Sequence, residues 1–254
     1  MKYLHPILIL SLAIHFGIVT GQSRQSDNSN NFYSSIKNYD LSCLWTADSI
    51  LAEDREGGRQ KIKRFEPLGY IDTNYQRFFI RIISVTRKKD NPYEYFVSGK
   101  TKIKDNICSF QGTIKVSNAD TGRTEEFPLL KVGAVTCEVL FSEDKNLPNS
   151  GIIQGKLTSY FIIDWKGKMR YDAIMYVADN FYNNQFKGTW TSYKTKTSII
   201  CNWGDYCQPA GKSPIILEAL SYPNCNLRSE KPHQKTTPKF NSLQHQKQLG
   251  LCIY

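Results

Sequence analysis

Apolar and polar residues alternate along most of the body of the chain, with a period of two. In the segment 75–85 the apolar residues Phe78, Ile80 and Ile82 fall on one face. The basic residue Arg77 falls on the opposite face. Because side chains in a β-strand point alternately to the two sides of the sheet, this pattern predicts a strand with one buried face.

The same alternation returns in later segments, and turn-forming residues separate each segment from the next. These segments are 93–103, 107–116, 133–141, 153–163 and 169–175. Short strands at regular spacing, with no long helical period between them, are typical of an antiparallel β-barrel or β-sandwich. The sequence therefore predicts an all-β fold, either a calyx-like, mainly antiparallel barrel or a sandwich.

The segment 36–51 follows neither the strand period nor the helix period. It contains Trp45 together with several polar residues that are able to cap a helix. Two interpretations stay open for this segment. It forms either a first strand or a short helix that packs across the mouth of the barrel.

Three glycines occupy equivalent places in three predicted strands, each between two apolar residues on the same face. They are Gly112, Gly155 and Gly188. A glycine in a strand leaves room for a large neighbour such as Trp190 to lie across the strand, or lets a barrel wall bend sharply. The alternative is that these glycines open space for a ligand inside a calyx. Packing is the simpler interpretation.

The beginning of the chain has the pattern of a secretory signal peptide. Lys2 precedes an apolar run from Ile7 to Val19, and small or β-branched residues stand before Gln22. This run is shorter than the roughly 20 residues needed to span a bilayer, so no transmembrane segment is expected. We predict a signal peptide at 1–21 and a mature protein that is secreted or resides in the periplasm or cell envelope.

The rest of the chain divides by composition into three parts. The prediction is a polar tether at 22–39, one β-domain at 40–206 and a poorly ordered, basic tail at 207–254. The tether and the tail contain too few apolar residues in a regular pattern to form a core of their own.

The chain is basic, with 33 Lys and Arg against 23 Asp and Glu and a net charge of +10. The predicted tail holds six Lys or Arg and two Glu, and so carries +4 of this charge. The remaining excess is dispersed, and no block of Lys and Arg is interleaved with aromatic residues. Nucleic acid is therefore not an expected partner.

The predicted folded body contains no histidine. The four histidines are His5, His15, His233 and His245. A Ser-His-Asp or Cys-His nucleophilic site, or a zinc site with histidine ligands, is therefore not expected. The glycine-rich phosphate-binding sequences GxGxxG and Walker A are also missing from the sequence. We predict neither a metal site nor a cofactor.

Carboxylates are the remaining candidates for acid and base chemistry. Those that stand near aromatic residues are Asp164, Asp172, Asp179 and Asp205. Two carboxyl groups roughly 5 to 9 Å apart would be the minimal apparatus of a glycoside hydrolase. Spacing along the sequence does not determine this distance, and Asp164 has the position of a turn residue.

Seven cysteines in an exported protein suggest disulfide bonds, with one cysteine left over. Cys108 and Cys137 each fall on the apolar face of a predicted strand, and the two strands follow one another in the chain. We predict a disulfide between Cys108 and Cys137, which requires Cα atoms about 4.4 to 6.8 Å apart. The competing interpretation is that both are buried thiols.

Several segments of the predicted β-domain have distinctive sequences. They are Gly69-Tyr70-Ile71, Asn74-Tyr75-Gln76-Arg77-Phe78, Asn91-Pro92-Tyr93-Glu94-Tyr95-Phe96-Val97, Asn106-Ile107-Cys108-Ser109-Phe110-Gln111-Gly112-Thr113-Ile114, Gly188-Thr189-Trp190-Thr191-Ser192-Tyr193-Lys194-Thr195 and Cys201-Asn202-Trp203-Gly204-Asp205-Tyr206. Through them the chain resembles a group of uncharacterised secreted proteins from Bacteroidota-type bacteria, over roughly residues 40–206. The resemblance implies bacterial origin and export, and no activity. After Tyr206 the chain departs from the pattern of the group, where a further ordered segment is expected.

These observations favour an exported, non-catalytic binding or envelope-associated protein. Aromatic residues make up 13% of the chain, and they suit stacking against a sugar as well as packing. The predicted ligand, a small apolar molecule or a glycan, would lie among aromatic residues of the central stretch, namely Tyr160, Trp165, Tyr171, Trp190 and Tyr193. The alternative function is a carboxylate-dependent glycan hydrolase.

Overall fold

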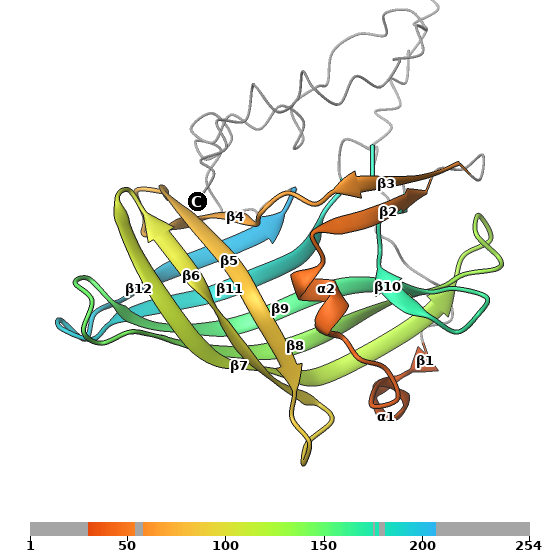
Figure 1. Ribbon diagram of the computed structural model, residues 1–254, viewed down its shortest axis with the longest axis horizontal. Coiled ribbons are helices and arrows are strands. Elements are labelled where there is room, and N and C mark those ends of the chain that lie inside the picture. The colour runs from red at the N-terminus through yellow and green to blue at the C-terminus, as the bar shows by residue number, and fades with distance from the viewer. Residues whose placement is uncertain (1–29, 54–57, 175, 178–180, 207–254) are drawn as a thin grey trace, which may run out of the picture.

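The computed structural model describes residues 30–53, 58–174, 176–177 and 181–206 (Figure 1). The predicted signal peptide and the predicted tail lie outside the described residues, and so do Met175 and Asp179. Strands dominate the described part of the chain, and its helices are short.

The elements follow one another in the chain in a simple order. They are β1 (Asn30–Asn31), α1 (Tyr33–Ile36), α2 (Ser42–Thr46), β2 (Ser49–Glu53), β3 (Arg59–Lys63), β4 (Leu68–Ile71), β5 (Gln76–Arg87), β6 (Glu94–Ile103), β7 (Asn106–Arg123), β8 (Lys131–Glu143), β9 (Gly151–Ile163), β10 (Met169–Tyr171), β11 (Asn183–Ser192) and β12 (Ser198–Asp205).

Eight antiparallel strands pair into a closed ring, in the order β4, β5, β6, β7, β8, β9, β11, β12 and back to β4. The short strands β1 and β10 add to β7 and β9, and β2 and β3 form a separate hairpin. Ring neighbours mostly follow each other in the chain, so the fold is an up-and-down barrel. The prediction of an all-β, antiparallel barrel is confirmed.

The alternating residues of the sequence point as predicted. On β5, Phe78 and Ile80 are buried, whereas Arg77 and Arg81 are exposed. Such an alternation is what a barrel wall requires, because successive side chains face the interior and the solvent in turn.

The predicted tether is wrong for residues 30–39, because these residues form β1 and α1 against the barrel. Phe32 N–H donates a hydrogen bond to the carbonyl of Ala119 on β7, and Ile36 is buried. Asn30 and Asn31 pair with β7, where it extends beyond its neighbour β6. A few apolar residues in a polar segment are therefore enough to order it when a sheet edge and an apolar surface are close.

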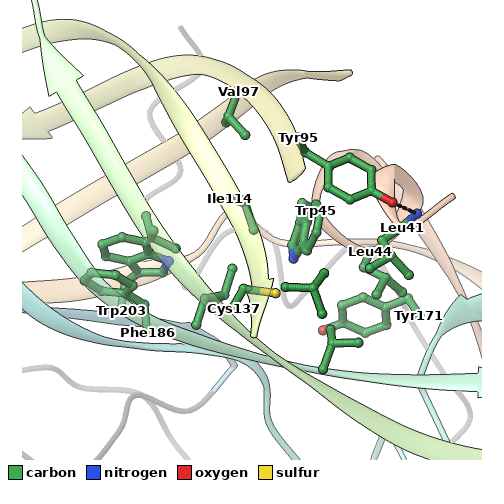
Figure 2. Packing of buried hydrophobic residues seen from close by; sticks show 14 of the residues in the cluster. Leu41, Leu44, Trp45, Tyr95, Val97, Ile114, Cys137, Tyr171, Phe186 and Trp203 are labelled. Atoms are coloured by element: carbon green, nitrogen blue, oxygen red, sulfur yellow. Dashed lines mark hydrogen bonds between the residues drawn. The ribbon is translucent and has the colours of Figure 1, made fainter. Parts of the chain in front are cut away.

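The segment 36–51 forms the helix α2 and then enters β2, so both interpretations of this segment hold in part. Trp45 on α2 donates a hydrogen bond from Nε1 to Ser159 Oγ at 2.9 Å, and its ring meets that of Tyr95 edge-on at 5.2 Å. The backbone N–H of Leu41 donates to Tyr95 Oη at 3.1 Å (Figure 2). The helix α2 is thereby fixed across one end of the barrel.

Aromatic rings fill the middle of the barrel. Phe186 stacks on Trp203 with ring centroids 3.6 Å apart, and Phe141 lies 6.5 Å from Trp203 and 4.6 Å from Phe110 (Figure 2 labels Phe186 and Trp203). All four side chains are buried. An eight-stranded barrel is just wide enough for its interior to be filled by side chains or to hold one small ligand. In this protein the side chains occupy the centre.

The strand glycines make room for these rings. A Cβ atom added to Gly188 would lie 2.5 Å from the ring of Phe186, and one added to Gly155 would lie 2.8 Å from the same ring. Both distances are too short for real atoms, so only glycine fits at these two positions. The packing interpretation of the glycines is confirmed for Phe186, and a related contact joins Trp190 to Gly151.

Charged residues line the outer wall of the barrel at its middle. One row crosses four neighbouring strands, with Lys187 opposite Lys156, Lys156 opposite Glu138, and Glu138 opposite Lys115. Alternating charges on adjacent strands stabilise such a row, and the Lys187–Lys156 pair is the exception. No helix in the described part of the chain is both long enough and apolar enough to cross a bilayer.

Candidate functional site

The two ends of the barrel are built differently. We call one the α2 end, where α2, the β2–β3 hairpin and the turn between β9 and β10 lie (Figure 1). We call the other the Glu143 end, where the connections β6–β7, β8–β9 and β11–β12 turn the chain. Glu143 is a buried carboxylate at its own end, and Asp205 is one at the α2 end, where Glu53 and Asp172 are buried as well.

The structure does not bring the five predicted ligand-binding aromatics together in one site. Tyr171 pairs with Phe161 in the register of β9, whereas Trp190 pairs with Ile153. These two positions on β9 are about 26 Å apart along the strand, at about 3.3 Å per residue. A single site formed by the whole set is therefore a wrong prediction.

Three of the five lie at the α2 end. Tyr171 is buried and donates its hydroxyl hydrogen to Asp205 Oδ2 at 2.9 Å. Tyr160 meets the ring of Tyr182 edge-on with centroids 5.5 Å apart. Trp165, in contrast, is 67% exposed. Of the three, Trp165 is the one that presents its ring to solvent.

The other two lie at the Glu143 end. Trp190 is half-buried and donates from Nε1 to Glu143 Oε2 at 2.9 Å. Tyr193 is also half-buried, and the ammonium group of Lys145 lies 5.3 Å from the centroid of its ring. Trp190 therefore helps to close this end of the barrel and is held by a structural contact.

Trp165 stands on a turn that hydrogen bonds between the Asp164 carboxylate and the backbone of the same turn hold in place. Asp164 Oδ1 accepts hydrogen bonds from the backbone N–H groups of Lys166 at 3.0 Å and Lys168 at 2.9 Å. Gly167 has a φ of +76°, a left-handed conformation that costs glycine little. Lys166 Nζ lies 4.8 Å from the centre of the indole ring. A large aromatic ring is thus presented to solvent from a fixed support.

Glu143 at its own end has donors on both of its oxygens. Thr101 donates its hydroxyl hydrogen to Oε1, while Gly151 N–H donates to Oε2 at 2.8 Å beside the contact from Trp190. All three donors are neutral groups. Since the side chain is buried and its hydrogen bonds are made, Glu143 has the environment of a structural residue.

Asp205 at the α2 end accepts hydrogen bonds on only one of its two carboxylate oxygens. Its Oδ2 atom accepts from Arg64 Nε at 3.2 Å, Arg64 Nη2 at 2.9 Å, Tyr171 Oη at 2.9 Å and Asn184 Nδ2 at 2.8 Å. No described residue donates to Asp205 Oδ1 or to Asn184 Oδ1. Asp205 is only 1% exposed, so its charge is balanced chiefly by the buried guanidinium of Arg64.

Burial is the largest influence on the pKa values of Asp205 and Tyr171 in this cluster. Removal from water raises the pKa of the Asp205 carboxyl, although Arg64 and the hydrogen bonds from Tyr171 and Asn184 act in the opposite direction. Burial also raises the pKa of Tyr171 well above its usual value, with a further contribution from the charge of Asp205. The Tyr171 hydroxyl is therefore protonated at neutral pH and donates a hydrogen bond to Asp205.

The other predicted carboxylates have structural contacts. Asp164 fixes the turn that carries Trp165, and Asp172 Oδ1 accepts from the backbone N–H of Ile174 at 3.0 Å. Asp179 lies outside the described residues. In the described ranges, no group of three or more His, Cys, Asp or Glu side chains is placed to hold a metal ion.

The predicted disulfide between Cys108 and Cys137 is wrong, since both are free thiols. The register of β7 and β8 places Val116 opposite Cys137, and Cys108 lies eight residues from Val116, about 26 Å along β7. The competing interpretation of two buried thiols is confirmed. Burial raises the pKa of Cys137, so this thiol stays protonated and unreactive.

Three residues of these networks, Arg64, Glu143 and Asn184, were not among the residues predicted from the sequence. Glu143 and Asn184 sit at strand ends, at the inward-facing positions of their strands, which the alternation alone assigns to the core. A charged or amide residue at such a position signals a buried polar network. Arg64 lies before β4, outside any alternating segment, so no local signal identified it.

Comparisons of the chain with protein-family models, with curated proteins and with solved structures found no match. The geometry of the two ends is therefore the basis for a functional argument.

Proposed function

We propose that this chain is an exported, non-catalytic binding protein that contacts its ligand, a glycan, through the turn Asp164–Lys168 at the α2 end. The observation that carries this proposal is the exposure of Trp165 on a turn fixed by hydrogen bonds. An aromatic ring held rigidly in solvent loses little conformational freedom when it stacks against a sugar.

The filled interior supports a contact on the surface. Phe110, Phe141, Phe186 and Trp203 occupy the centre of the barrel, where a calyx would hold a small apolar molecule. Such a ligand would have to displace rings that already pack at contact distance. A sugar ring on Trp165 displaces only solvent.

Non-catalytic binding has more support than carboxylate-dependent hydrolysis. A catalytic carboxylate must reach the bond that it cleaves. Asp205 and Glu143 are 1% and 4% exposed, and their polar contacts are to the protein. Asp164 is accessible, but its Oδ1 is engaged by two backbone N–H groups of its own turn.

The test is a glycan-binding screen on the mature protein, read out by tryptophan fluorescence. Trp45 and Trp203 are buried, and Trp190 is half-buried, so a ligand at the turn should mainly quench Trp165. Replacement Trp165→Ala should weaken binding about thirtyfold or more, the effect expected for an aromatic residue at the centre of an interface.

Phe96→Ala is the matched control. Phe96 is 56% exposed and also lies beneath a lysine, with Lys88 Nζ 4.6 Å from its ring, but it stands on the barrel wall. This control should bind like the wild-type protein. The absence of binding to any glycan, or equal losses for the two variants, would contradict the proposal.

A further inference from the structure

We infer that the ligand of the Trp165 turn is an acidic glycan, whose carboxylate or sulfate groups contact Lys166 and Lys168. This inference rests on the proposed function and deepens it, since it names the chemical class of the ligand. The observations that carry it are the arrangement of cations beside Trp165 and the way in which the neighbouring carboxylates are used.

Three basic residues alternate along the chain directly after Trp165. Lys166 and Lys168 are exposed, and Arg170 follows two residues later on β10. Met169 and Tyr171, which alternate with them, are buried in the core. Arg170 pairs with Glu53 and its side chain is only 17% exposed, so Lys166 and Lys168 are the accessible cations of the three. Two neighbouring cations fit adjacent charges of a linear polymer.

The carboxylates nearby are already engaged. Asp164 Oδ1 accepts the two backbone N–H groups of its own turn. Glu53 pairs with two arginines, through Oε1 with Arg59 Nε at 2.7 Å and through Oε2 with Arg170 Nη2 at 2.6 Å. Two arginines against one glutamate leave one positive charge in excess. Among these residues the four cations Lys166, Lys168, Arg59 and Arg170 outnumber the two carboxylates Asp164 and Glu53.

Arg170 is held from within the protein. Its Nη2 atom donates to Glu53 and its Nη1 atom is buried, so this guanidinium is not placed to meet a ligand. The exposed ammonium groups of Lys166 and Lys168 are the cations beside Trp165 that an oxyanion can reach. Lys166 Nζ lies over one face of the indole ring of Trp165, and a sugar ring can stack on the other face.

A glycan fits this surface better than an anionic membrane does. Stable docking on a bilayer needs a large apolar face inserted into the headgroup region. The turn offers one exposed aromatic ring, flanked by the exposed side chains of Lys166 and Lys168. A single ring with two cations matches one sugar of a chain and the anionic groups of its neighbours.

The experiment measures binding of the mature protein to acidic oligosaccharides and to their neutral counterparts. The probes are oligogalacturonate with its methyl ester, and chondroitin sulfate with its desulfated, carboxyl-reduced form. Each acidic probe should bind at least roughly tenfold more tightly than its neutral partner, and the difference should shrink as salt is raised from about 0.05 M to about 0.5 M.

Two double variants locate the effect. The replacement of Lys166→Gln with Lys168→Gln should weaken binding of the acidic probe roughly tenfold. The control replaces Lys156→Gln and Lys187→Gln, which remove the same charge from exposed positions on the barrel wall. It should change binding less than twofold, roughly the size of a long-range screened effect.

The outcomes separate this inference from the proposal on which it rests. If acidic and neutral probes bind equally and Trp165→Ala abolishes both, the proposed function stands and the acidic ligand class is wrong. Equal effects of the two double variants would also overturn the inference. If the protein binds anionic phosphatidylglycerol vesicles and none of the sugars, both are overturned.

Discussion

Asp205 at the α2 end and Glu143 at the opposite end are both buried carboxylates, and their surroundings stabilise them in different ways. Glu143 accepts hydrogen bonds on both oxygens from three neutral groups. Asp205 accepts all of its described hydrogen bonds on one oxygen, and its charge is balanced by Arg64. A network of neutral donors tolerates the loss of a charge, whereas a buried ion pair leaves the other charge behind when one partner is removed.

The two ends also differ in how they use a tryptophan. At the Glu143 end, Trp190 is half-buried and hydrogen-bonded, and the turns between strands are short. At the α2 end, Trp165 stands in solvent beside a row of basic residues. A tryptophan thus helps to close the barrel at the Glu143 end, and another tryptophan is exposed to solvent at the α2 end.

The largest effect is expected from Asp205→Ala. This variant leaves the guanidinium of Arg64 buried without its counter-charge, and the hydroxyl of Tyr171 without its acceptor. The free energy of unfolding should fall by about 3 to 5 kcal/mol in urea denaturation. The control is Glu66→Ala, which removes a half-exposed partner of Arg81 and should cost less than about 1 kcal/mol. Equal losses would show that the buried pair is no more important than the surface pair.

A smaller loss is expected from Glu143→Gln. The amide keeps the shape of the side chain and can still accept from Gly151 and Trp190 with its oxygen. The hydroxyl of Thr101 can rotate to accept from the new amide nitrogen. The free energy of unfolding should fall by about 1 to 2 kcal/mol. A loss as large as that of Asp205→Ala would contradict the difference drawn between the two ends.

The pH dependence of stability should distinguish the two ends further. The pKa of Asp205 is raised above 3.8 in the folded protein, so the folded state holds this proton more tightly than the unfolded state does. Its contribution to the free energy of unfolding therefore decreases as pH rises from about 3.8 through the folded pKa, and is constant above it. Subtraction of the Asp205→Asn curve from the wild-type curve should isolate this slope. If the wild-type minus Asp205→Asn difference in the free energy of unfolding rises over the same pH range, the pKa of Asp205 is lowered in the folded protein.

The smallest effect is a gain at the Glu143 end. Lys104 begins the two-residue loop between β6 and β7, and its φ of 52° is left-handed. Left-handed backbone costs a residue with a side chain about 1 kcal/mol and costs glycine little. Lys104→Gly should raise the free energy of unfolding by about 0.5 to 1 kcal/mol. Both free energies are measured by thermal unfolding. Asp105→Gly is the control: because the φ of Asp105 is not positive, this variant should not raise the free energy of unfolding.

Much of the barrel could be predicted from local sequence. The alternation that includes Phe78 and Ile80 gave the strand β5 and its inward face, and the same holds for Cys137 and Phe141 on β8. These predictions succeed because the period of a strand is a local property, and burial of one face requires apolar residues at every second position. The packing interpretation also holds for Gly155 and Gly188, because a missing side chain between apolar residues marks a close approach.

The candidate site was predicted only in part. Trp165 was among the chosen aromatics, but Tyr171 and Trp190 had the same appearance in the sequence and proved to be structural. Aromatic residues at inward and turn positions are chemically alike, and their exposure depends on neighbours far away in the chain. The disulfide failed for a related reason, since consecutive strands do not reveal which residues stand opposite each other.

The sequence by itself determined the strands, their inward faces and the turns, because each depends on residues within a few positions of one another. Only the tertiary structure decided which strands close the ring, how β7 and β8 are aligned, and which partners surround Asp205. Arg64 and Asp205 are 141 residues apart in the chain, and their contact follows from closure of β4 on β12. Register and closure are set by the summed packing of the whole barrel, so no short segment encodes them.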